Sequence, residues 1–190
     1  EAGTKYLGGH SDLLMGVVSA NESWWPKLRQ TYDLMAMLPG AEDCFLALRG
    51  LRTMHLRLKE AEKRGLEMAH WLSERPEVMK VLHPALPECP GHELWKRDFT
   101  GSSGLFSFVL KSEFTKAGVA NMLDHMGIFG MGYSWGGFES LMIPFNCADY
   151  RTATTWQPGG LTLRIQIGLE DMDDLKTDLA EGFARLRAVV

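Results

Sequence analysis

The alternation of apolar and polar residues divides most of the chain into segments of helical and of strand periodicity. The longest helical pattern covers residues 41–74, where apolar or small residues recur at spacings of three and four and line one face. These positions are Leu51, Met54, Leu58, Ala61, Gly65, Met68 and Leu72. Arg75-Pro76 ends the pattern, because the residue before a proline avoids the helical region. We therefore expect one long helix here.

Three shorter segments also predict helices, at residues 21–37, 115–126 and 171–187. In the first, Pro26 is compatible with an initial turn, and Pro39-Gly40 stops the pattern. The last segment carries acidic residues in its first turn and basic residues in its last, which matches the helix dipole. These residues are Asp171, Asp173, Asp174, Arg185 and Arg187.

Strand patterns cover residues 78–82, 105–110 and 161–167, and residues 6–18 predict a loop followed by a short buried strand. In residues 161–167 the odd positions are aliphatic and the even positions are Thr162, Arg164 and Gln166. Period-two alternation therefore places Arg164 on the face opposite the core. Strands separated by helices, after a long leading helix, predict an α/β or α+β fold with a domain boundary near residue 55.

Composition and charge narrow the classes of partner. The chain is 45% hydrophobic and 23% charged, with a net charge of -4 and both signs interleaved. Nucleic acid and anionic membranes call for a concentrated basic face, so we expect a small-molecule partner instead. No apolar run is long enough for a membrane span. Cys44, Cys89 and Cys147 have no metal-ligand spacing with the histidines, so no metal is expected, and they suit a reducing cytosol as free thiols.

Lys5 is the first candidate for chemistry. Gly3 precedes it and Gly8-Gly9 follow, which permits a close backbone approach to a bulky group. A lysine that forms a covalent bond with an aldehyde needs such a setting. Taken by itself, this spacing leaves open that Lys5 is a solvated residue near a terminus.

Four motifs, in order along the chain, indicate a family. Residues 4–12 (TKYLGGHSD) resemble the T-K-Y-x-x-G-H-S-D signature around the cofactor lysine of the Cys/Met-metabolism family of pyridoxal-phosphate enzymes. Residues 49–53 (RGLRT) resemble its R-G-L-[KR]-T segment, and residues 134–141 (SWGGFESL) its S-x-G-G-x-E-S-L segment. Residues 163–171 (LRIQIGLED) resemble its closing stretch. Together the motifs span nearly the whole chain.

Within that family, three features resemble the cystathionine β-lyase branch. Trp135 stands where the γ-synthase and γ-lyase branches usually carry leucine, and Ala2 where many relatives carry a phosphate-binding serine. Residues 92–104 (HELWKRDFTGSSG) also look like the bacterial β-lyases, although their glycines and serines by themselves indicate a plain turn. The resemblance implies cleavage of L-cystathionine to homocysteine, pyruvate and ammonia, in methionine biosynthesis, by a cytoplasmic homo-oligomer. A γ-lyase or γ-synthase, and a non-catalytic domain with this fold, remain alternatives.

The resemblance also implies the fold and the site. Residues 1–55 would end a fold-type-I large domain that binds pyridoxal 5'-phosphate, and residues 56–190 would form a small C-terminal domain of sheet packed with helices. Lys5 would be catalytic and carry the cofactor, with Thr4 beside it. Ser134, Trp135 and Arg164 would bind the substrate, with Arg164 on its α-carboxylate. From the pattern alone, a solvated strand face at Arg164 and a plain turn at Ser134-Trp135 stay open.

The family places other cofactor contacts upstream of the region that this sequence resembles. The aromatic residue stacked on the cofactor ring, the aspartate facing the pyridine nitrogen and most phosphate contacts belong to that upstream part. None of them matches a motif in these 190 residues. The expectation is that the chain is an incomplete C-terminal portion and is inactive when isolated.

Overall fold

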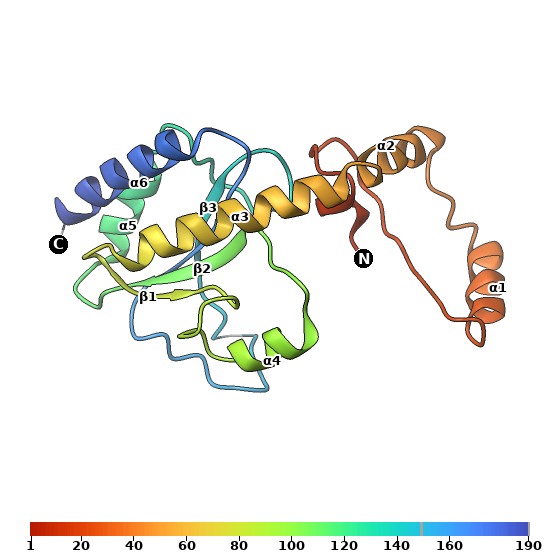
Figure 1. Cartoon of the computed structure of the whole chain (residues 1–190), viewed down its shortest axis with the longest axis horizontal. Coiled ribbons are helices and arrows are strands. Elements are labelled where there is room, and N and C mark those ends of the chain that lie inside the picture. Colours follow the sequence, from red (N-terminus) through yellow and green to blue (C-terminus); the bar gives the residue numbers. More distant parts are fainter. Residues whose placement is uncertain (149, 190) are drawn as a thin grey trace. The chain divides into compact units, whose positions relative to one another are not determined.

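The computed structural model describes residues 1–148 and 150–189. The chain divides into two compact units, Glu1–Arg57 and Leu58–Val190. The first unit contains a single wide turn, η1 (Gly3–Leu7), and the helices α1 (Trp25–Met35) and α2 (Ala41–Leu51). The boundary between the units falls inside the helix α3 (Met54–Ser73). The elements that follow, along the chain, are β1 (Val78–Leu82), α4 (His92–Asp98), β2 (Leu105–Leu110), α5 (Lys116–Leu123), β3 (Leu141–Phe145), β4 (Thr162–Gln166) and α6 (Met172–Arg187) (Figure 1).

The second unit is built around an antiparallel sheet with strand order β1-β2-β4-β3. Arg164 lies on the inner strand β4, paired with Ser107 of β2 and Ile143 of β3. Its neighbours Leu163 and Ile165 are fully buried in the core. The prediction that Arg164 points away from the core is therefore confirmed, since adjacent residues of a strand face opposite sides of a sheet.

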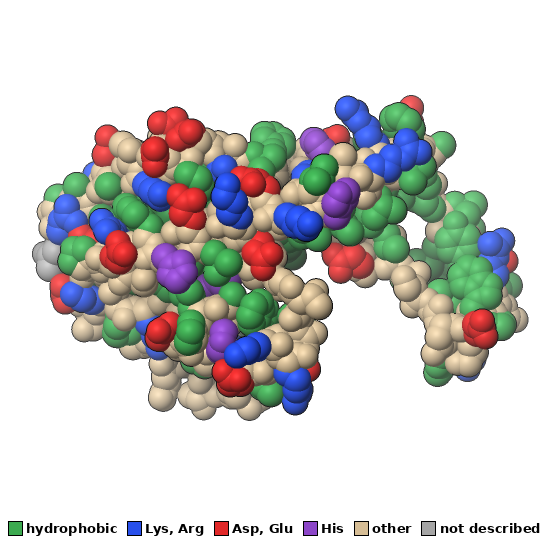
Figure 2. Space-filling view, in the orientation of Figure 1, with side chains coloured by type: hydrophobic (Ala, Val, Ile, Leu, Met, Phe, Trp, Pro, Cys, Tyr) green, Lys and Arg blue, Asp and Glu red, His purple; other side chains and the backbone are tan. Residues whose placement is uncertain are grey.

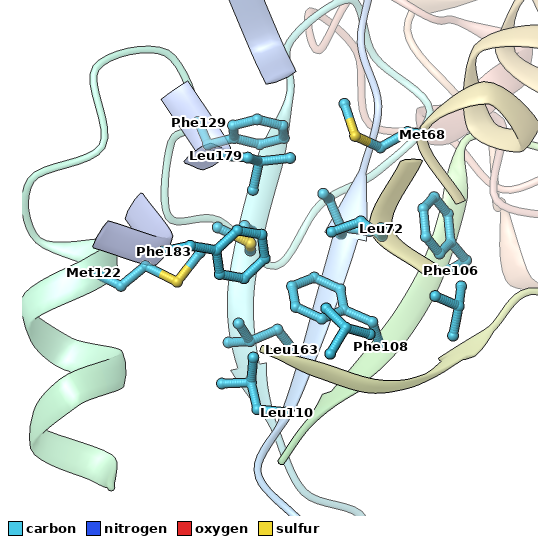
Figure 3. Close-up of a cluster of buried hydrophobic side chains, with 14 of the residues drawn as sticks. Met68, Leu72, Phe106, Phe108, Leu110, Met122, Phe129, Leu163, Leu179 and Phe183 are labelled. Carbon is cyan, nitrogen blue, oxygen red and sulfur yellow. The ribbon is translucent and has the colours of Figure 1, made fainter. Parts of the chain in front are cut away.

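The core of this unit lies between one face of the sheet and the helices α3, α5 and α6. Figure 3 shows side chains from all of these elements in contact, with Phe108 and Phe183 near the middle. Burying each large apolar side chain contributes about 1.5–3 kcal/mol, so this cluster dominates the stability of the unit. Its fully buried members include Met68, Ala69, Leu72, Phe108, Leu110, Met122, Leu163, Ile165, Leu175, Leu179, Phe183 and Leu186.

Helix ends follow from side-chain caps. The Asp171 carboxylate accepts hydrogen bonds from the backbone N–H groups of Asp173 and Asp174 at the start of α6, at 2.9 and 3.3 Å. The Thr115 hydroxyl accepts one from Gly118 at 3.1 Å and begins α5. Both helices, and the strands predicted at residues 78–82, 105–110 and 161–167, are confirmed to within a few residues. The α/β fold class is confirmed as well.

Two predicted elements are wrong. The helix expected over residues 41–74 is two helices, because Arg52 and Thr53 form a turn in which the Thr53 N–H and hydroxyl both donate to the Gly50 carbonyl. The buried strand expected within residues 6–18 is absent from the described residues: Gly16 makes only an isolated bridge to Ala2, and Val18 is 71% exposed. The segment pairs with residues 1–4 only over a short length, through the Thr4 N–H to the Met15 carbonyl and the Val17 N–H to the Glu1 carbonyl.

Two elements were not predicted. The strand β3 contains Pro144, which lacks a backbone N–H and weakens a strand pattern, although it is tolerated at a sheet edge. The helix α4 is only 7 residues long and follows Gly91, which has a φ of 87°. It lies in the segment for which the sequence indicated a plain turn. None of the helices in the described part of the chain combines the length and apolar character needed to cross a bilayer.

The first unit leaves much of its apolar surface exposed. Figure 2 shows hydrophobic side chains gathered over α1, and others lie on α2. Patches above a few hundred Å² mark surfaces that associate with another surface. The exposed large hydrophobic residues of this unit, hereafter the apolar face, are Leu14, Val18, Trp24, Trp25, Leu34, Met35, Met37, Leu38, Phe45, Leu48, Leu51 and Leu56.

The isolated chain is expected to self-associate through this apolar face. In sedimentation-velocity experiments the mean mass should rise with protein concentration, and the pair L34E and L38E should reduce that rise, because Leu34 and Leu38 are 78% and 70% exposed. The control is L94E, since Leu94 on α4 of the second unit is 58% exposed. A monomer at all concentrations, or an equal effect of L94E, would contradict this expectation.

Candidate functional site

The lysine turn, residues 3–9, is fixed by its own backbone. The Gly8 N–H donates to the Gly3 carbonyl at 2.9 Å, and the Gly9 N–H donates to the Lys5 carbonyl at 2.8 Å. Gly3, Gly8 and Gly9 are buried, whereas Lys5 is half-buried. Gly9 has a φ of 77°, a conformation that favours glycine. The turn therefore holds the Lys5 backbone in place.

Arg57 holds the same turn from the start of α3. Its guanidinium donates to the carbonyls of Tyr6, Leu7 and Gly50, at 2.6, 3.1 and 2.7 Å. Burial lowers the pKa of Arg57 from its ordinary value, yet arginine keeps its charge in proteins. A Cβ at Gly50 would overlap the carbonyl oxygens of Leu7 and Gly8, so α2 lies directly against the turn. This clamp, Arg57 with Gly50, was not foreseen from the sequence.

Thr4 and His10 contact the backbone near the lysine. The Met15 N–H donates to the Thr4 hydroxyl at 3.0 Å, and that hydroxyl lies 3.4 Å from the Met15 carbonyl oxygen. His10 Nδ1 lies 2.9 Å from the Gly8 carbonyl oxygen. These contacts join the turn to the segment that follows it. A contact of Thr4 with the cofactor stays a prediction.

The arginine site lies in the second unit, around Arg164 on β4. The Arg164 guanidinium carbon lies 5.8 Å from the ring centroid of Tyr133 and 5.6 Å from that of Trp135. One terminal nitrogen donates to the carbonyls of Gly132 and Ser134 at 3.4 and 3.5 Å, which are long hydrogen bonds. The rings and carbonyls thus hold the guanidinium loosely. Among the described residues, no carboxylate forms an ion pair with it.

Electrostatics favour an anion at Arg164. Burial lowers the pKa of Arg164, while Tyr133 and Tyr150 act in the opposite direction, and the group stays protonated. Thr162 and Gln166, on the same face of β4, are only 4% and 2% exposed, so the alternative of a solvated strand face is wrong there. The planar guanidinium of Arg164, partly shielded from water, is therefore suited to bind a carboxylate through two hydrogen bonds.

The five predicted residues fall in both units. Ser134, Trp135 and Arg164 come together in the second unit, and Lys5 and Thr4 lie in the first. Tyr133 was missed, although its place next to Ser134 was a usable signal. Arg57 was also missed, because nothing local shows that it reaches residues some 50 positions earlier. In the described part of the chain, no three His, Cys, Asp or Glu side chains gather as metal ligands would.

The residues present fit an aldehyde cofactor held by a lysine. Lys5 is half-buried on a turn that Arg57 holds in place, and a lysine in such a setting can form a covalent bond with an aldehyde. A lysine so placed and an arginine prepared for a carboxylate are features of an enzyme that acts on amino acids. The chain belongs to the family of Cys/Met metabolism PLP-dependent enzymes, whose model matches residues 1–184. Pyridoxal phosphate as the cofactor is thereby confirmed.

Similar proteins support the same branch that the motifs indicated. The chain is 67% identical to a putative cystathionine β-lyase of Saccharomyces cerevisiae over 137 residues, 72% of this chain and 40% of the relative. It is 48% identical to cystathionine β-lyase of Escherichia coli over 189 residues, 98% of this chain and 48% of the relative. A solved cystathionine γ-synthase of Xanthomonas oryzae, in complex with cystathionine, has a TM-score of 0.85 at 32% identity, covering 100% of this chain and 50% of that one. The chain therefore spans about half the length of these relatives.

Proposed function

We propose that the full-length protein is a carbon–sulfur β-lyase that converts L-cystathionine and water to homocysteine, pyruvate and ammonia. The observation that carries the proposal is Arg164, a charged fork between the rings of Tyr133 and Trp135 with no carboxylate partner among the described residues. The identity to cystathionine β-lyases supports the same reaction. The γ-synthase structure in complex with cystathionine supports the substrate class.

Lys5 has two roles in this proposal. Pyridoxal phosphate, when bound, supplies the electron sink for bond cleavage next to the amino acid's Cα. Lys5 holds the cofactor through its side-chain amine, and Thr4 supports it from the neighbouring position. When its amine is free, Lys5 would remove the proton from the substrate's Cα and would then protonate the departing sulfur. The clamp of Arg57 on the turn would fix the direction of both proton transfers.

Arg164, Trp135 and Ser134 act on the substrate's carboxylate end. Arg164 binds the α-carboxylate through two parallel N–H···O bonds, which keeps the Cα–H bond aligned for removal of its proton. Trp135 covers the guanidinium and excludes water from the carboxylate site. Ser134 would bind the substrate beside Trp135, as the second unit brings the two residues together with Arg164.

The wider organisation is part of the proposal. Residues 1–55 would complete a large cofactor-binding domain and residues 56–190 would form the small domain. The apolar face of the first unit supports a position against other protein surface, as in a homo-oligomer. Free Cys44, Cys89 and Cys147 support a cytoplasmic location.

The products of the reaction test the proposal. The full-length protein, loaded with pyridoxal phosphate, is incubated with L-cystathionine, and the 2-oxo acid and the thiol are identified by mass spectrometry. Pyruvate with homocysteine supports the β-lyase. Cysteine with 2-oxobutyrate means cleavage on the other side of the sulfur, as in a γ-lyase. The similarity to a γ-synthase structure is the reason to test this alternative. No consumption of cystathionine by the loaded protein would favour a non-catalytic domain.

A further inference from the structure

The Glu170 carboxylate fixes one end of the loop that precedes β3, residues 124–140. Its Oε1 accepts a hydrogen bond from the Ser140 N–H at 2.7 Å, and its Oε2 accepts one from the Ser140 hydroxyl at 2.7 Å. The Ser140 oxygen in turn accepts one from the Gly168 N–H at 2.8 Å. Ser140 is 1% exposed, so each of these groups would be costly to leave without a partner.

The segment after β4 also lies directly against this loop. The Leu169 N–H donates to the Phe138 carbonyl at 2.7 Å. A Cβ at Gly168 would overlap the Phe138 carbonyl oxygen and lie 2.5 Å from the Glu139 carbonyl carbon. The loop can therefore keep this position only while residue 168 is glycine.

Arg64 of α3 holds the segment from the other side. Its Nε donates to the Gly168 carbonyl at 2.8 Å, and one terminal nitrogen donates to the Glu170 carbonyl. Arg64 is 9% exposed, and Glu60 lies 3.7 Å from its remaining terminal nitrogen. Residues 168–170 are thus fixed between a helix and the loop.

The same loop and the same strand meet a second time at Arg164. The loop residues Gly132 and Ser134 accept the hydrogen bonds of Arg164, and β4 runs from Arg164 to Gln166, two residues before Gly168. The contacts at Arg164 are long, whereas those at Glu170 are short. The loop is thus held by short hydrogen bonds at its Glu170 end and by long ones at its Arg164 end.

We propose that Glu170, Ser140 and Gly168 form a positioning network that sets the orientation of the Arg164 fork by holding residues 132–135 in place. None of the three needs to touch the substrate. The inference rests on the proposed binding of the substrate's carboxylate by Arg164. It adds that this binding would depend on Glu170, Ser140 and Gly168.

A double-mutant cycle in the full-length, cofactor-loaded protein tests this inference. E170A should lower kcat/KM for L-cystathionine by about 10- to 100-fold, with most of the change in KM, because the carboxylate is bound less well. E170Q should recover part of the loss, since an amide can still accept the Ser140 N–H. In the R164L background E170A should have almost no further effect, because residues that act through one group are not additive. G168A should reproduce E170A by displacing the loop.

The control is E77A, which removes another buried carboxylate of the same unit. Glu77 is 2% exposed and is bound by Arg187, away from the loop. E77A should lower thermal stability and leave KM unchanged. Provided that R164L is impaired, three results would overturn the positioning role. They are no loss from E170A, equal losses from E170A in the parent and in R164L, and a KM change in E77A that matches that of E170A. A silent R164L would instead overturn the proposed carboxylate site, and the positioning role with it.

Discussion

K5A in the full-length protein is expected to abolish turnover of L-cystathionine, with kcat at least about 10³-fold lower. The substitution removes both the group that holds the cofactor and the general base, and a positioned base alone contributes about 10²–10⁴-fold. The neighbouring backbone should be unaffected, because the turn is held by Arg57 and by main-chain hydrogen bonds. Circular dichroism and thermal unfolding should therefore match the parent.

Chemical labelling checks the same assignment without a mutation. Borohydride reduction of the loaded protein attaches the cofactor permanently to the lysine that carries it, and peptide mapping should find it on the peptide with Thr4, Lys5 and Tyr6. K27A serves as the control variant, since Lys27 lies on the exposed helix α1 of the same unit. Label on Lys27 or Lys59, or full activity of K5A, would remove Lys5 from its proposed role.

R164L is expected to lower kcat/KM for L-cystathionine by about two to four orders of magnitude. Each charge-assisted hydrogen bond to the carboxylate is worth roughly 1.5–3 kcal/mol, and two are lost. Cofactor content and absorbance should stay near those of the parent, because Lys5 is unchanged. Steady-state kinetics and an absorbance spectrum of the same preparation measure both quantities.

R164K should recover only part of the R164L loss, since an ammonium cannot reproduce the planar fork. R151L is a matched control: Arg151 also lies over a ring, with its guanidinium carbon 5.1 Å from the centroid of Trp156, but it is exposed. That variant should keep near-parental kinetics. Near-parental kinetics in R164L itself would mean that Arg164 does not bind substrate.

The sequence predicted the elements whose patterns are local. Period-two alternation was enough to place Arg164 opposite the buried Leu163 and Ile165, because a strand has only two faces. The Asp171 cap and the acidic first turn likewise identified the start of α6. The ordered motifs named the family, and the family model covers them.

The features that sequence reasoning missed depend on contacts between distant residues. The break between α2 and α3 comes from the turn at Arg52 and Thr53, which helical periodicity does not reveal. The Arg57 clamp and the Glu170–Ser140 network join residues 30 to 51 positions apart. Tyr133 completes the surroundings of Arg164 only because the loop before β3 folds over β4. Such contacts require the tertiary structure.

The two edge strands of the sheet in the second unit each carry a feature that hinders pairing with a strand of another molecule. On β3, Pro144 removes a backbone donor, and on β1 the register shifts between Val78 and Lys80, which puts an irregularity and a charge on the other edge. Prolines, bulges and lysines on edge strands hinder the addition of a strand from another molecule. Self-association of this chain would therefore not proceed by growth of a continuous intermolecular sheet, and the fibrillar route is disfavoured even where the apolar face of the first unit is uncovered.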